Sequence, residues 1–212
     1  MKKIKIFTLI LLVILVLVGC SNNSTPADPA NTDTTPENTD IVPEETPVSE
    51  DTEPRILVAY FSATGNTKGV AEKMAGILGA DLYEIVPAVP YTTADLNYND
   101  SSCRANQEQN DKSFRTEIVG SVDNMDQYDI VLIGHPVWWG EEPRIIDTFV
   151  EAYDFNGKIV SNFCTSGGSG VSNSTNNLKN MLPDSDYRDG MRFDKNAGED
   201  DINNWLTGIN IK

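Results

Sequence analysis

The chain has 212 residues, of which 32 are acidic and 16 basic, and its formal net charge is −16. Setting aside three lysines in residues 1–20 and nine acids in residues 21–54 leaves 23 acids and 13 bases from Arg55 onward, a net charge of −10. This balance excludes nucleic acid as a partner, because its phosphates require a basic surface, and it favours partners with a basic face. Residues 55–212 have the usual length of one domain with a complete core.

The first 20 residues predict a secretory signal. Three lysines give a basic start, and residues 6–18 are almost wholly apolar. That run is shorter than the ~20 residues that cross a bilayer core, and it fits the apolar region of a signal peptide. Its end, Leu17-Val18-Gly19-Cys20, resembles the lipobox of bacterial lipoproteins, which implies acylation of Cys20 and a lipid anchor outside the cytoplasmic membrane. The alternative is an uncleaved signal anchor with an incidental cysteine.

Residues 21–54 predict a solvated tether. The segment has no aromatic residue, no Lys and no Arg, and it is rich in Pro, Thr, Asn, Asp and Glu. It therefore has little apolar surface to offset the entropy of ordering. We expect a disordered spacer that reaches roughly 30 Å as a flexible coil.

The domain begins with a strand, a tight polar turn and a helix. Ile56 to Tyr60 is a short apolar run, typical of a strand buried on both faces. The turn that follows is Ser62-Ala63-Thr64-Gly65-Asn66-Thr67. Gly79 stands where a helix would stop. Apolar residues recur at helical spacing between the turn and this glycine; they are Val70, Met74, Ile77 and Leu78.

This turn has the chemistry of a phosphate cradle. A helix amino terminus presents unpaired N–H groups and a partial positive charge, and Gly65 lets the backbone come close to a ligand. The hydroxyls of Ser62, Thr64 and Thr67 can donate hydrogen bonds. No Lys or Arg lies inside the turn, so it suits a terminal monophosphate better than a triphosphate. The alternative is a polar turn with no ligand.

The remaining pattern alternates strands with helices. Strands are expected at residues 81–86, 128–134, 158–164 and 190–193, and helices from Pro143 to Gly157, around residues 178–182 and from Asp201 onward. This alternation predicts an α/β fold with a parallel sheet that helices cover on both faces. Such sheets bind ligands beyond the carboxyl ends of their strands, where the strand order reverses.

The turns after the third and fourth strands are unusual, as that geometry requires. The third strand is followed by Pro136-Val137-Trp138-Trp139-Gly140, and two tryptophans in an exposed turn call for an aromatic partner such as an isoalloxazine ring. We expect one of the two tryptophans to lie in the core. The fourth strand is followed by Thr165-Ser166-Gly167-Gly168-Ser169-Gly170, which offers donors and a close backbone approach, although alone it would indicate only a flexible turn.

Together the three turns resemble those of flavodoxins, and more closely those of the flavodoxin-like lipoproteins of bacteria. The first turn matches neither the nucleoside-triphosphate loop nor the Gly-x-Gly-x-x-Gly fingerprint, and it resembles the FMN phosphate loop of flavodoxins. The resemblance covers most of residues 55–193 and implies a three-layer sandwich with a five-stranded parallel sheet in the order 2-1-3-4-5. It implies FMN as cofactor, with residues 62–67 on the phosphate, residues 136–140 flanking the ring and Thr165, Ser166, Gly167 and Gly168 on its far side.

Several features depart from this pattern or remain open. Residues 88–116 form a long polar insert, which could cover the flavin, or be a surface excursion held by an Arg104–Glu108 pair. His135 could bond at the strand end or deliver protons. Cys103 and Cys164 could pair, although a strand position makes Cys164 a small buried residue by the usual pattern. No His/Cys cluster indicates a metal.

Three functions follow from these observations. The first is an FMN-binding electron-transfer protein, lipid-anchored outside the cytoplasmic membrane. The second is an oxidoreductase of the same fold, an NAD(P)H-dependent quinone or flavin reductase, which the insert favours. The third is a surface binding module with a vestigial flavin site, against which the complete hydroxyl set of residues 62–67 argues. The sequence ranks the carrier first and assigns no catalytic residue.

Overall fold

The computed structural model describes residues 53–212. The predicted signal peptide of residues 1–20, its acylation site Cys20 and almost all of the predicted tether of residues 21–54 lie outside the described residues, so these remain predictions. Within the described part, no helix is long and apolar enough to cross a membrane.

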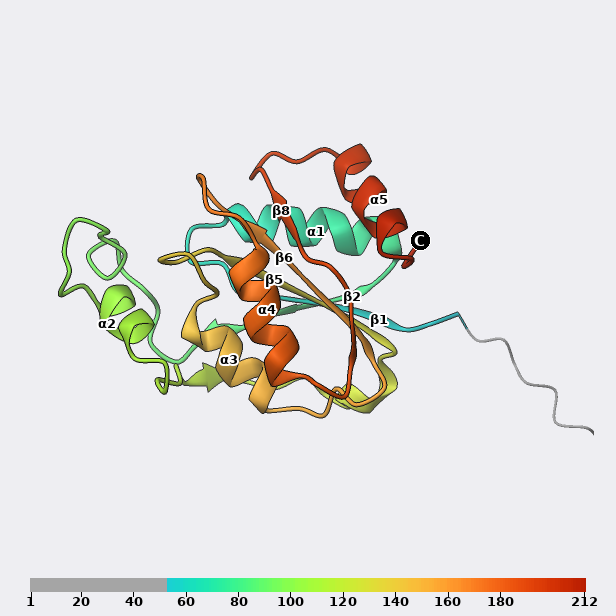
Figure 1. Ribbon diagram of the computed structural model, residues 1–212, viewed down its shortest axis with the longest axis horizontal. Coiled ribbons are helices and arrows are strands. Elements are labelled where there is room, and N and C mark those ends of the chain that lie inside the picture. Colours follow the sequence, from blue (N-terminus) through green and yellow to red (C-terminus); the bar gives the residue numbers. More distant parts are fainter. Residues whose placement is uncertain (1–52) are drawn as a thin grey trace, which may run out of the picture. The chain divides into compact units, whose positions relative to one another are not determined.

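A parallel sheet forms the centre of the domain (Figure 1). Its order is β2-β1-β5-β6-β7, and β8 also pairs with β6. Every pairing in this sheet is parallel. The predicted order 2-1-3-4-5 is confirmed, with the fifth position shared by two short strands. The strands are β1 (Ile56–Tyr60), β2 (Asp81–Glu84), β5 (Ile130–Pro136), β6 (Ile159–Thr165), β7 (Asp186–Tyr187) and β8 (Met191–Phe193).

The break between β7 and β8 has a local cause. The Ser161 hydroxyl donates to the carbonyls of Arg188 at 3.3 Å and Asp189 at 3.0 Å, which occupies backbone acceptors there. At Gly190, a Cβ atom would lie 2.8 Å from the backbone oxygen of Asn162. The chain therefore runs so close to β6 at Gly190 that only glycine, which has no Cβ atom, fits there.

Replacing Gly190 tests this close approach. We expect Gly190→Ala to lower the free energy of unfolding by about 1–3 kcal/mol, because the contacted Asn162 oxygen belongs to the backbone and cannot move aside. The matched control is Gly76→Ala in α1, where an added Cβ meets nothing within 4 Å. That change should be neutral or stabilising by up to about 1 kcal/mol. Urea unfolding measures both, and equal stability of the two variants would contradict the account.

Helices cover both faces of the sheet, which gives the predicted three layers (Figure 1). On one face, residues of α1 and α5 pack with Val58, Leu132 and Phe163. On the other, α3 and α4 pack with Val131, Ile133 and other residues of the sheet. The helices are α1 (Asn66–Leu78), α2 (Arg104–Asn110), α3 (Arg144–Glu151), α4 (Ser172–Met181) and α5 (Glu199–Gly208), with a 3-10 turn at Met125–Gln127.

Two helix ends differ from their predictions. Helix α3 stops at Glu151, well before Gly157, because Ala152 closes it with a bond to the Phe149 carbonyl. Helix α5 begins two residues before Asp201. The Asp201 carboxylate accepts the Gly198 N–H at 3.2 Å, so it caps the helix from inside the first turn. Gly79 closes α1 as predicted, in the left-handed region at φ 60°.

The insert is a separate substructure at the carboxyl ends of the strands (Figure 1). The predicted strand of residues 81–86 is confirmed as β2 over residues 81–84 and is wrong at its end, where β3 (Val86–Pro87) instead pairs antiparallel with β4 (Ile118–Val119). This short ladder closes the base of the insert. Inside it, the predicted Arg104–Glu108 pair is confirmed at 2.6 Å, and the Arg104 guanidinium lies 4.1 Å from the centre of the Tyr91 ring.

Candidate functional site

The turns after β1, β5 and β6 meet around one cavity of about 460 Å³. This volume is within the range of about 300–1,000 Å³ typical of small-molecule sites. Among the residues predicted for the site, the cavity is lined by Ala63, Thr64, Asn66, Pro136, Val137, Trp138, Thr165, Ser166 and Gly167. Other predicted residues belong to the same turns without lining it; they are Ser62, Gly65, Thr67, Trp139, Gly140 and Gly168.

The first turn is built to expose the amino terminus of α1. Gly65 sits before the helix with φ 85°, a conformation that costs glycine little. The Asn66 amide donates to the Thr64 hydroxyl at 3.3 Å, and both side chains are exposed. Thr67 is different: it is 1% exposed, and its hydroxyl lies 2.9 Å from that of Thr165. Thr67 therefore joins the first turn to the end of β6 and does not face the cavity.

The two tryptophans have opposite environments. Trp138 is 3% exposed and packs edge-on against Phe61 and Tyr91, with ring centres 5.5 and 5.0 Å away. Trp139 is 40% exposed, and its ring centre lies 5.1 Å from that of Tyr98 in the insert. The expectation that one of the pair lies in the core is confirmed, and Trp139 remains available at the surface.

The turn that carries them is a tight one. Trp138 and Glu141 exchange two backbone hydrogen bonds of 2.9 and 3.1 Å, and the two residues between them have positive φ, 47° for Trp139 and 87° for Gly140. Positive φ at both central positions defines a type I′ turn, which favours Asn followed by Gly. A bulky residue such as Trp139 is disfavoured in this conformation, and strain of this kind concentrates at functional sites.

A buried polar network holds the end of β5. His135 is fully buried, with Nδ1 2.9 Å from the Pro136 carbonyl and Nε2 3.1 Å from the Asn162 amide nitrogen. Because a carbonyl only accepts, Nδ1 carries the hydrogen and Nε2 accepts. Burial lowers the His135 pKa to about 4. These contacts support the hydrogen-bonding role over proton delivery.

Charged residues tie the insert to the start of α3, just after the tryptophan turn. The Gln109 amide donates to the Glu142 carbonyl at 2.8 Å, and Arg144 donates to the Gln109 carbonyl at 3.2 Å. Arg144 also bonds Glu141 at 2.7 Å and Asp147 at 3.0 Å. Glu142 is 1% exposed, and burial raises its pKa to about 7. The insert is therefore fixed to the scaffold beside the site.

The two cysteines of the domain do not pair. Cys103 and Cys164 are both free and buried, so the possibility of a disulfide is ruled out in this structure. Burial raises the Cys164 pKa to about 12, which makes it the inert packing residue that its strand position indicates. Among residues 53–212, no group of three or more His, Cys, Asp or Glu side chains could hold a metal ion.

Four lining residues were not assigned to the site from the sequence: Leu96, Tyr98, Asp194 and Lys195. Lys195 places a cation at the cavity, although the phosphate turn itself has none. Lys195 comes two residues after the end of β8. Because the carboxyl ends of parallel strands meet at one edge of the sheet, a place for Lys195 beside the cavity could have been predicted from the sequence. Leu96 and Tyr98 come from the insert, and no pattern in the sequence predicts where the residues of the insert lie relative to the sheet.

Comparisons with known proteins identify a family and solved structures that this chain resembles. The family model described as flavodoxin matches residues 55–209. A candidate flavoprotein of Bacteroides eggerthii is 45% identical, with a TM-score of 0.72, over 76% of this chain and 100% of that one. One from Bacteroides uniformis is 37% identical, with a TM-score of 0.70, over 74% and 99%.

A flavoprotein of Lactobacillus acidophilus in complex with FMN is 25% identical, with a TM-score of 0.58, over 72% and 99% of the two chains. No curated protein matches the chain. The family match spans nearly all of the described residues, and the two Bacteroides structures share the same fold at clear sequence identity. The chain belongs to the flavodoxin family.

Proposed function

We propose that the domain binds FMN noncovalently and transfers electrons. The observation that carries this proposal is the meeting of three separate turns around one cavity at the amino terminus of α1. A member of the same fold in complex with FMN supports the choice of flavin.

The residues present fit this cofactor. Thr64 and Asn66, which line the cavity, would hold the phosphate together with the first N–H groups of α1, and Ser62 lies in the same turn. Pro136, Val137 and Trp138 would flank the ring, and Thr165, Ser166 and Gly167 would line its other side. Tyr98 and Trp139 form an exposed aromatic pair beside them. Trp138 lines the cavity with apolar surface, and Phe61 and Tyr91 pack against its ring from behind.

FMN supplies the redox chemistry when bound, and the protein supplies position, electrostatics and shielding. The net charge of −10 from Arg55 onward disfavours further negative charge in the cavity. Lys195 opposes this effect locally, but it is exposed and screened. We therefore expect a reduction potential below that of free FMN.

The test uses residues 53–212. The Bacteroides eggerthii structure matches this domain over 100% of its own length, so we expect the domain to fold without residues 1–52. FMN should bind with a shifted visible spectrum and quenched fluorescence, and titration should give the lowered potential. A domain that stays colourless with added FMN would overturn the cofactor proposal, and a potential above that of free FMN would overturn the electrostatic one.

The proposal includes an anchor at Cys20, outside the cytoplasmic membrane of a bacterium. The basic start, the apolar run and the lipobox-like Leu17-Val18-Gly19-Cys20 support it. Expressed in a bacterium, the full chain should incorporate labelled palmitate and sediment with membranes, whereas Cys20→Ser should do neither. Equal labelling of the two forms would contradict the anchor.

A second function, an NAD(P)H-dependent quinone or flavin reductase, has one specific observation in its favour. Leu96 and Tyr98 of the insert line the cavity, so the insert is placed to shape a substrate pocket. Steady-state turnover of NADH or NADPH with a quinone, by the FMN-loaded domain, would establish this function. Absence of turnover above free FMN leaves the carrier.

Trp139 offers a prediction in which stability and function separate. Trp139→Asn should raise the free energy of unfolding by about 1 kcal/mol, because Asn tolerates the left-handed backbone that Trp disfavours. The same change should weaken FMN binding by about two- to tenfold, because it removes the ring that packs 5.1 Å from Tyr98 in the cavity wall, and an aromatic contact contributes about 0.5–1.5 kcal/mol. Thermal unfolding of the apo domain and fluorescence titration measure the two effects. A loss of stability with unchanged affinity would contradict the assignment.

A further inference from the structure

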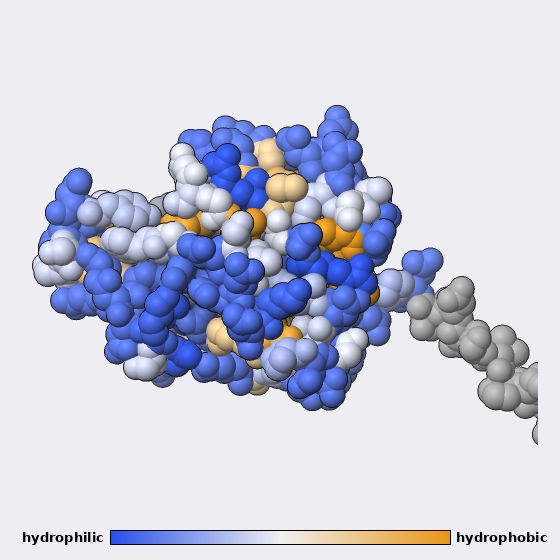
Figure 2. Space-filling view, in the orientation of Figure 1, coloured by the Kyte–Doolittle hydropathy of each residue, from blue (hydrophilic) through white to orange (hydrophobic). Residues whose placement is uncertain are grey.

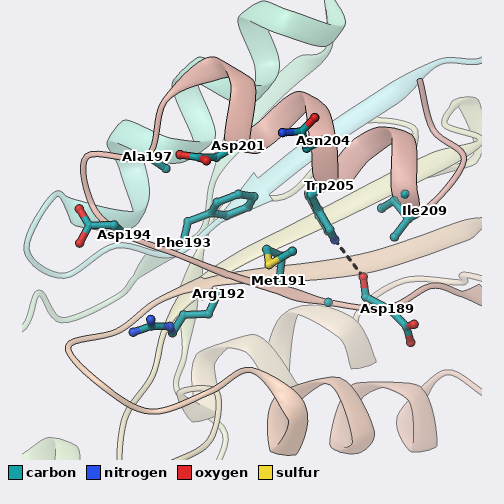
Figure 3. Close-up of a pocket in the computed structure, with 12 residues that line it drawn as sticks. Asp189, Met191, Arg192, Phe193, Asp194, Ala197, Asp201, Asn204, Trp205 and Ile209 are labelled. Carbon is teal, nitrogen blue, oxygen red and sulfur yellow. Dashed lines mark hydrogen bonds between the residues drawn. The ribbon is translucent and has the colours of Figure 1, made fainter.

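A second hollow lies between β8 and α5, and it shares one lining residue, Asp194, with the proposed flavin cavity. It has a volume of about 520 Å³. Met191, Phe193 and Trp205 form its apolar floor and face one another between strand and helix (Figure 3). The Trp205 indole donates to the Asp189 carbonyl at 3.1 Å, which fixes the ring. Met191 is 38% exposed. Figure 2 shows patches of apolar surface among hydrophilic residues in the region where Figure 1 draws β8 and α5.

This hollow borders an open strand edge. β8 pairs with β6, and no other described residue pairs with it. An unpaired edge presents backbone N–H and C=O groups that an extended chain can bond, while pockets beside the edge take alternate side chains. Here the apolar floor lies directly beside that edge. The arrangement therefore fits an extended peptide better than a rigid globular surface.

The charges of the residues that line the hollow favour a basic ligand there. Asp189, Asp194 and Asp201 line the hollow, against the single base Arg192, which points to the opposite side of the strand (Figure 3). The acidic residues 21–54 of this chain, with nine acids and no base, would be repelled. Antiparallel pairing of two copies centred on Arg192 would place two arginines opposite each other, which is destabilising.

We propose that the hollow between β8 and α5 is a docking site for an extended, basic segment of a partner protein. The segment adds to the edge of β8, inserts an apolar side chain over Phe193 and Trp205, and places Lys or Arg against Asp189 and Asp194. This binding does not require a flavin, so it is independent of the function proposed above.

A selection experiment with a steric block tests this. Gly208 lines the hollow, and an added Cβ there meets nothing within 4 Å, so Gly208→Phe can add a bulky ring at the hollow without a clash at its Cβ. Gly76→Phe in α1 is the matched control, with the same open space and no place in the hollow. The probe is a displayed library of random peptides of about ten residues, a length sufficient to add one strand. It is selected on residues 53–212 of wild type.

Enriched peptides should alternate apolar residues with Lys or Arg. Gly208→Phe should weaken their binding by about tenfold or more, Asp189→Lys should weaken it similarly, and Gly76→Phe should leave it unchanged. The proposal is overturned if no peptide is enriched, if the selected peptides lack basic residues, or if they bind Gly208→Phe as well as wild type. It is also overturned if wild type sediments as a dimer that Gly208→Phe dissociates, since a second copy would then be the occupant.

Discussion

FMN is expected to bind the domain about 100-fold more tightly than riboflavin does. The two differ only in the phosphate, and the cavity ends at the exposed amino terminus of α1, beside Thr64 and Asn66. Hydrogen bonds to a charged group contribute about 1.5–3 kcal/mol each, and two such bonds would give this ratio or more. Fluorescence titration of residues 53–212 with each flavin measures it.

A single substitution locates the effect. Thr64→Val removes a hydroxyl at nearly constant shape, so FMN affinity should fall by about tenfold while riboflavin affinity stays unchanged. Thr207→Val is the control, since Thr207 is equally exposed on α5 and remote from the turn. An equal loss for both flavins would show that Thr64 acts on the ring or on folding, and equal affinity of wild type for FMN and riboflavin would remove the phosphate from the site altogether.

Local patterns predicted the sheet and the three turns because both depend on short-range periodicity. The apolar runs at residues 56–60 and 128–134 are typical of strands buried on both faces. β1 coincides with the first run, and β5 is shifted by two residues from the second. Positions of parallel strand ends then follow from topology. The end of the strand predicted at residues 81–86 was wrong because Val86 and Pro87 pair with residues 118–119, more than 30 positions away.

Side-chain direction within the turns was beyond this reasoning. Thr67 looks like the other hydroxyl residues of its turn, yet it is the second residue of α1, and its buried side chain meets Thr165. Adjacent Trp138 and Trp139 diverge because a type I′ turn separates their directions, and no local signal marks that turn, since Trp is an unusual residue for it. Tyr98 reaches the site only through the fold of the insert.

Two buried groups, His135 and Glu142, should make opposing contributions to the pH dependence of stability in wild type. His135 has its pKa lowered from 6.5 to about 4, so the unfolded state takes up a proton first and stability falls as pH falls through this window. Glu142 has its pKa raised from 4.5 to about 7, so the folded state holds the proton and stability falls as pH rises through this window. Each effect amounts to about 3 kcal/mol.

Glu142→Gln should uncover the His135 effect. At pH 8 the variant should be more stable than wild type by about 2–3 kcal/mol, because it removes a buried charge beside Asp147, while near pH 4.5 the two should be equal. Its stability should then fall steadily on acidification from pH 7. Glu117→Gln, at an exposed carboxylate, is the control and should follow wild type within about 0.5 kcal/mol. Urea unfolding at pH 4.5, 6 and 8 measures the curves. If the stability of Glu142→Gln ran parallel to that of wild type at all three pH values, the pKa of Glu142 would not be raised. Burial of its carboxylate beside Asp147 would then cost no stability at high pH.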